Sequence, residues 1–147
     1  MNNLLETLTT LALSLTELQT ILAEENRQLS ALKIQPLELQ RLSDAKSKQL
    51  STVAYYDARR QLQEQQNRVI APYAGNAELA AAWREIVLKV KKASEWNQQS
   101  GLLLERHQQA AKALRGVFEK SGAKATLYGA KGQPGSPSAV RAYRHLA

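Results

Sequence analysis

The first 32 residues carry a heptad pattern of leucines that restricts this chain to a helical, coiled-coil type of packing. Apolar positions recur at alternating spacings of four and three residues, which place all of them on one face of an α-helix. Leu5, Ala12 and Ile21 widen this stripe enough to meet more than one neighbouring helix. We therefore predict a helix over about residues 3–32, roughly 45 Å long. Eight of the nine heptad positions are leucine: Leu4, Leu8, Leu11, Leu15, Leu18, Leu22, Glu25, Leu29 and Leu32.

Two further helices are predicted from the positions of proline, glycine and polar residues. Pro36 disfavours helical geometry at the residue before it and fits a first helical turn, so a second helix is predicted over about residues 36–70. Residues 59–68 are almost wholly polar, which indicates a solvated end or a polar partner. Residues 72–76 are predicted to form a turn, with Asn76 as the N-cap of a third helix over about residues 77–120.

The third predicted helix is longer than the other two. At roughly 65 Å it is expected to project beyond its neighbours. Gly101 in its interior costs about 1 kcal/mol of helix propensity, which is tolerable if another helix approaches closely there or if a polar residue fixes the register. The predicted fold is all-α, a long antiparallel three-helix bundle or coiled coil with a flexible C-terminal tail. The early part of the third helix has an expected seam of Trp83, Val87, Val90, Ser94, Asn97, Gly101 and Leu104.

Charge divides the chain into two regions. The whole chain of 147 residues has a formal net charge of +7. Residues 1–120, predicted as one helical domain, hold 16 of the 20 basic residues and all 13 acidic residues, whereas residues 121–147 hold four basic residues and no acid. Such an acid-free tail can contact an acidic protein surface, RNA or anionic lipid, or can simply be solvated.

The residue types needed for catalysis or metal binding are scarce. There is no cysteine, and the two histidines, His107 and His145, lie far apart in the sequence. No glycine-rich phosphate loop is present. We therefore expect no enzyme activity, no catalytic or metal site, no cofactor and no small-molecule substrate. No apolar run approaches the roughly 20 residues of a membrane span, and the N-terminus lacks a basic leader, so no membrane insertion and a cytoplasmic location are expected.

Two apolar features remain as candidate binding surfaces. One is an amphipathic stripe at the end of the third helix, which either meets a partner helix or is covered by the first helix. The other is a Leu-Tyr pair in the docking motif of residues 126–133, which either docks on a partner or folds back onto the helices. The stripe residues are Leu103, Leu104, His107, Ala111, Leu114, Val117 and Phe118, and the docking residues are Leu127, Tyr128 and Gly129.

These features occur in an order that resembles the FlgN family of flagellar type III export chaperones. A leucine-striped first helix precedes a second helix with Leu39, Leu42, Lys46 and Leu50. Then follow an Asn-x-x-Ser-Gly-x-Leu-Leu run over residues 97–104, Gln-Gln-Ala at 108–110, and a terminal Leu-Tyr-Gly-x-x-Gly over 127–132. The resemblance covers about residues 4–133. Ser100 departs from the family, which more often has Asn there.

The resemblance implies a function in protein export. It implies a cytosolic chaperone whose C-terminal part binds the hook–filament junction (hook-associated) proteins FlgK and FlgL and prevents their premature assembly. It also implies docking on the cytoplasmic domain of the export-gate protein FlhA, through a tyrosine that Tyr128 matches. No nucleotide or metal is implied.

Two other classes of function stay open on the residues alone. One is a helical coiled-coil adaptor. The other is a basic RNA-binding or regulatory protein, because Arg59–Arg60, Lys89, Lys91, Lys92 and the tail form basic clusters. Nucleic acid is the less favoured partner, since aromatic residues do not interleave with these clusters.

Overall fold

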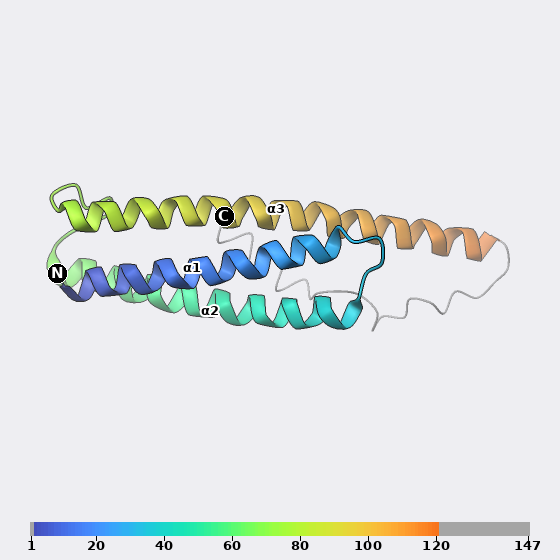
Figure 1. Ribbon diagram of the computed structural model, residues 1–147, viewed down its shortest axis with the longest axis horizontal. Coiled ribbons are helices and arrows are strands. Elements are labelled where there is room, and N and C mark those ends of the chain that lie inside the picture. Colours follow the sequence, from blue (N-terminus) through green and yellow to red (C-terminus); the bar gives the residue numbers. More distant parts are fainter. Residues whose placement is uncertain (1, 121–147) are drawn as a thin grey trace.

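The computed structural model describes residues 2–120, except for the side chain of Phe118, and consists of three long helices. These are α1 (Asn2–Leu29), α2 (Pro36–Asn67) and α3 (Ala77–Lys120). α1 and α3 run in the same direction and α2 runs in the opposite direction, and the end of α3 extends past both other helices (Figure 1). The described part of the chain has no strand, which confirms the predicted helical bundle. The docking motif of residues 126–133 lies outside the described residues, and the division into domain and tail stays a prediction.

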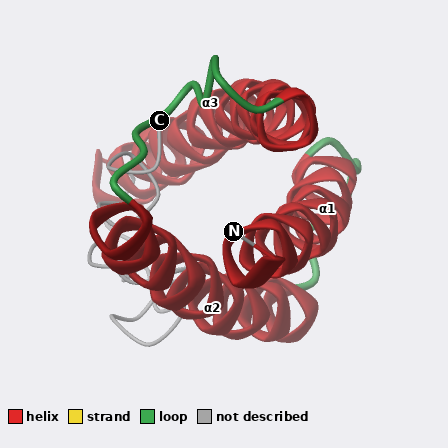
Figure 2. Ribbon diagram, turned by 90° about the vertical axis from the view of Figure 1, so that its left-hand side faces the viewer, coloured by secondary structure: helices red, strands yellow, loops and turns green. Residues whose placement is uncertain are grey.

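α1 is the central helix of the bundle. It packs against both α2 and α3, whereas the backbones of α2 and α3 approach each other closely at few positions. Figure 2 shows the three helices arranged around the long axis of the bundle. α1 and α3 run parallel: Gln19 donates to the Lys89 carbonyl at 3.0 Å, and Asn26 faces Gln99 further along. A wide apolar stripe on one helix therefore serves two neighbours. The buried leucines of α1 are Leu4, Leu8, Leu11, Leu15, Leu18, Leu22 and Leu29.

α1 ends three residues earlier than its leucine pattern predicts. The helix stops at Leu29, and residues 30–35 form the connection to α2. Leu32, expected on the buried seam, is fully exposed. Pro36 requires extended backbone at the residue before it, and Gln35 is extended, with φ −107° and ψ 99°. The chain must therefore leave the helix before Gln35, and because it does so after Leu29, Leu32 lies in the connection.

A polar layer interrupts the leucine core near the end of α1. Glu25, the one residue of the predicted seam that is not leucine, is buried and pairs with Lys46 of α2. Lys46 Nζ donates to both carboxylate oxygens of Glu25 at 3.0 Å. Burial lowers the pKa of the Lys46 ammonium, and Glu25 acts in the opposite direction. The pair thus joins α1 to α2 at one defined position along the bundle.

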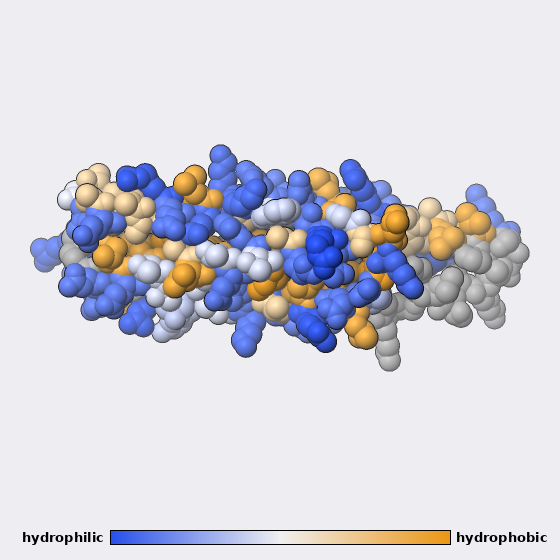
Figure 3. Space-filling model, in the orientation of Figure 1, coloured by the Kyte–Doolittle hydropathy of each residue, from blue (hydrophilic) through white to orange (hydrophobic). Residues whose placement is uncertain are grey.

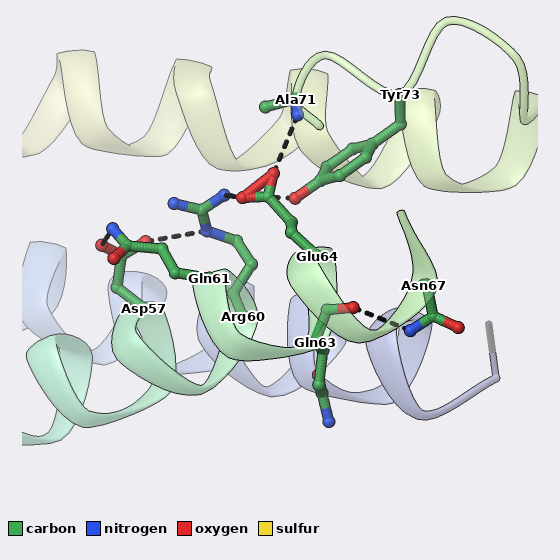
Figure 4. A network of polar contacts seen from close by, with 8 residues as sticks. All are labelled: Asp57, Arg60, Gln61, Gln63, Glu64, Asn67, Ala71 and Tyr73. Atoms are coloured by element: carbon green, nitrogen blue, oxygen red, sulfur yellow. Dashed lines mark hydrogen bonds and ion pairs between the residues drawn. The ribbon is translucent and has the colours of Figure 1, made fainter. Parts of the chain in front are cut away.

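A second polar network holds the connection between α2 and α3 (Figure 4). Arg60 donates to Asp57 and Glu64 at 2.8 Å and to the Tyr73 hydroxyl at 3.2 Å. Glu64 also accepts a hydrogen bond from the Ala71 backbone N–H at 2.9 Å. The guanidinium of Arg60 lies 4.6 Å from the ring centre of Trp83 on α3. Arg60 and Glu64 therefore meet polar partners in the connection, whereas most of residues 59–68 are exposed to solvent, so each of the two alternatives that the sequence left open holds for part of this segment.

α3 begins where the sequence predicts, but its buried face differs in part from the predicted one. Asn76 Oδ1 accepts a hydrogen bond from the Leu79 backbone N–H at 3.1 Å, as expected of an N-cap. One line of the predicted seam, Val87, Ser94 and Gly101, is out of phase by one residue, because Ile86 is buried whereas Val87 is about half exposed. Trp83 and Val90 of the other line pack against the core as predicted. Ile86 and Val87 are both apolar, so the pattern alone did not separate the two phases. The buried line of α3 runs through Leu79, Ile86, Ala93 and Ser100.

Candidate partner-binding surface

The C-terminal part of α3 extends beyond the end of α1. Nε2–H of His107 donates a hydrogen bond of 2.7 Å to the carbonyl oxygen of Leu29, the last residue of α1. His107 therefore marks the level at which α1 stops, and the last turns of α3 continue past it (Figure 1). Apolar side chains lie at the surface of this projecting end (Figure 3).

Exposure of the predicted stripe rises along α3. Leu103, Leu104, His107 and Ala111 are half-buried, near the end of α1. Leu114 is 43% exposed and Val117 is 64% exposed. The alternative that the first helix covers this stripe thus holds only for its beginning. The backbone of Phe118 belongs to α3, whereas Leu127, Tyr128 and Gly129 lie outside the described residues.

The stripe continues the buried line of α3 without a change of phase. His107 and Leu114 follow Ser100 at intervals of seven residues, as Ser100 follows Ala93. Such spacing keeps side chains on one face when a second helix lies alongside. Within residues 2–120, α1 therefore covers this face of α3 up to Leu29 and does not cover it beyond that residue.

Gly101 does not mediate helix packing within the bundle. A Cβ atom added at this residue would have no heavy atom within 4 Å. The alternative that another helix approaches Gly101 closely is therefore wrong for the described part of the chain. The neighbouring Ser100 is the buried residue, and no hydrogen-bond partner is found for its hydroxyl among the described residues.

Replacing His107 with alanine is expected to lower the free energy of unfolding by about 1 kcal/mol, because the Leu29 carbonyl loses its donor. Urea denaturation followed by circular dichroism would measure the change. His107→Gln keeps an N–H donor and serves as the control. An alanine variant as stable as the native chain would show that this hydrogen bond contributes nothing to the α1–α3 contact.

The basic clusters named for nucleic-acid binding are only partly available. Arg60 is buried in the network at the end of α2, and Lys89 donates to Thr16 of α1 at 2.7 Å. Lys92 lies 5.2 Å from the ring centre of Trp96. Within residues 2–120, no three His, Cys, Asp or Glu side chains gather as metal ligands would. None of the three described helices is long and apolar enough to cross a membrane.

Comparison with known proteins gives consistent matches along most of the chain. The family model described as FlgN protein matches residues 1–136. The Flagella synthesis protein FlgN of Salmonella typhimurium is 34% identical over 137 residues, covering 90% of this chain and 91% of that protein. The protein of the same name from Escherichia coli is 33% identical with the same coverage, and that from Proteus mirabilis is 33% identical over 127 residues. No solved structure matches this chain significantly.

Proposed function

The chain belongs to the FlgN family, and on this premise we propose that it is a cytoplasmic export chaperone in flagellum assembly. It binds the hook–filament junction proteins FlgK and FlgL, prevents their premature assembly and delivers them to the export gate. The proposal is for a binding protein without cofactor or catalytic site. Its relatives are named Flagella synthesis protein FlgN, which supports the role in flagellum synthesis.

The observation that carries this proposal is the uncovered stripe at the end of α3. Leu114 and Val117 are exposed on the same face of α3 that α1 covers in the part before His107. Apolar helical segments of junction proteins would associate with one another before export, because their stripes have no partner in the cytosol. A helix that lies on the stripe of α3 buries both surfaces and keeps such a client soluble.

Delivery is assigned to the segment after α3. We assign gate docking to Leu127, Tyr128 and Gly129, with the cytoplasmic domain of FlhA as the partner. A tyrosine buries a large ring at small entropic cost and often dominates a small interface. The surrounding basic residues, Lys124 and Lys131, speed the encounter with an acidic surface.

The direct test is co-purification of the chain from its own cells, followed by mass spectrometry. Junction proteins are expected among the captured proteins, and purified FlgK and FlgL should each form a complex with the chain. A chain that captures RNA instead, with affinity that falls steeply with salt, would favour the nucleic-acid alternative. A chain that binds neither class and only assembles with itself would favour the structural adaptor.

Replacing Tyr128 with alanine is expected to weaken binding to the FlhA cytoplasmic domain by roughly 30-fold, or about 2 kcal/mol, and to leave client binding unchanged. The two affinities are measured separately by calorimetry. Tyr128→Phe keeps the ring and is expected to retain most of the affinity. Equal loss of both activities in the alanine variant would contradict the division between cargo surface and docking segment.

A further inference from the structure

Two arginines flank the stripe of α3, one on each side. At about 100° per residue, Arg106 and Arg115 each lie roughly 90° from the centre of the stripe. The two acids of this segment, Glu105 and Glu119, lie roughly 130° or more from that centre. Among the ion pairs of residues 2–120, none involves Arg106 or Arg115. The apolar surface is thus bordered by positive charge that the described fold leaves without an acidic partner.

We propose that the occupant of this stripe is an acidic amphipathic helix that lies along α3 where α1 would lie if it continued past Leu29. This inference rests on the proposed function and specifies the chemistry of the client. The stripe from Leu103 to Val117 is about 20 Å long, which accommodates about four helical turns. The occupant presents apolar residues to Leu114 and Val117 and carboxylates to Arg106 and Arg115.

Continuity with the bundle supports a helix as the occupant. α1 already covers this face of α3 as a parallel helix with leucines at heptad spacing, and the carbonyl of Leu29 ends that cover at His107. The face beyond keeps the same seven-residue spacing through Leu114. A second helix therefore continues a packing geometry that α3 already has.

Two other occupants of the stripe could come from this chain: the projecting end of a second copy, and the segment of residues 121–147. The charges of both make them unfavourable. In a pair of identical projecting ends, the arginines of one copy would lie beside the arginines of the other, which is unfavourable. The segment of residues 121–147 contains four basic residues and no Asp or Glu, so it offers no acidic side chain to Arg106 or Arg115. An acidic helix from another protein satisfies both the apolar stripe and its borders.

The test uses the full chain and two synthetic 21-residue helical peptides. Both peptides carry leucine at the heptad a and d positions; one has glutamate and the other has lysine at the flanking e and g positions. Fluorescence anisotropy measures both affinities at low salt. We expect the glutamate peptide to bind at least about tenfold more tightly than the lysine peptide.

Reversing the two flanking charges is expected to invert this preference. The variant Arg106→Glu with Arg115→Glu should bind the lysine peptide more tightly. The matched control, Lys112→Glu with Lys120→Glu, changes the net charge equally at exposed positions further from the stripe and should keep the native preference. Equal binding of the two peptides, or the same inversion in the control, would overturn the proposal.

Measuring the molecular mass of the chain in solution tests whether a second copy of the chain occupies the stripe. A native chain that is dimeric, and that becomes monomeric when Leu114 is replaced with aspartate, would show that a second copy occupies the stripe and would overturn the proposal. Because no flagellar protein is used, failure here is distinguishable from failure of the proposed function. A chain that prefers the acidic peptide but binds neither FlgK nor FlgL would contradict only the named clients.

Discussion

Replacing Lys46 with methionine is expected to lower the free energy of unfolding by about 3–5 kcal/mol. Methionine leaves the carboxylate of Glu25 buried, with the two hydrogen bonds from Lys46 removed. An uncompensated buried charge costs far more than the ion pair contributes to stability. Urea denaturation of the native chain and the variant, followed by circular dichroism at pH 7, would measure the loss.

The double variant Glu25→Leu with Lys46→Met separates the cost of the unpaired charge from the contribution of the pair. Leucine continues the heptad of α1, so the double variant is expected to be about as stable as the native chain or more stable. A Lys46→Met variant with near-native stability would mean that water or another side chain solvates Glu25. A double variant as unstable as the single one would mean that packing around Lys46, rather than charge, is decisive.

Replacing Leu114 with aspartate is expected to weaken the binding of FlgK and FlgL by about 100-fold, or about 3 kcal/mol. The variant removes a leucine from the interface and places a carboxylate on an apolar surface. The fold should remain, because Leu114 is 43% exposed and lies beyond the end of α1. Calorimetric titration of each purified client gives the affinity, and thermal denaturation reports stability.

Leu102 provides the matched control for this variant. It is 58% exposed and lies about 130° from the centre of the stripe, so Leu102→Asp makes the same chemical change on a different face of α3. This control is expected to bind clients with native affinity. If Leu114→Asp bound normally while remaining folded, the stripe would not be the client surface; if both variants lost binding equally, the effect would come from the added charge.

Much of the candidate surface was predictable from sequence because its signals are local. The length of α3 and the apolar spacing from Leu103 to Phe118 are both readable along one helix. Whether that stripe is covered depends on where α1 ends, and the leucine pattern continued to Leu32, three residues too far. The flanking positions of Arg106 and Arg115 follow from helical geometry once the buried phase of α3 is known.

The amino-acid sequence by itself determined that residues 2–120 form three helices, where α2 and α3 begin, and that α3 is the longest of the three. Pro36 and the Asn76 cap act through the backbone within a few residues, and the heptad spacing of the leucines is visible along a single helix, so these signals can be recognised without knowing a tertiary contact. Only the tertiary structure decided which face of α3 is buried, because Ile86 and Val87 are both apolar and packing against α1 selects one of them.

The polar contacts between helices also needed the tertiary structure. Glu25 and Lys46 are 21 residues apart in sequence, and His107 and Leu29 are 78 apart, so no local rule pairs them. Their pairing is set by how far each helix slides along its neighbour, which the leucine core of α1 fixes. That alignment places the end of α1 at the level of His107, and α1 does not cover the last turns of α3, so the candidate binding surface depends on packing as well as on helix length.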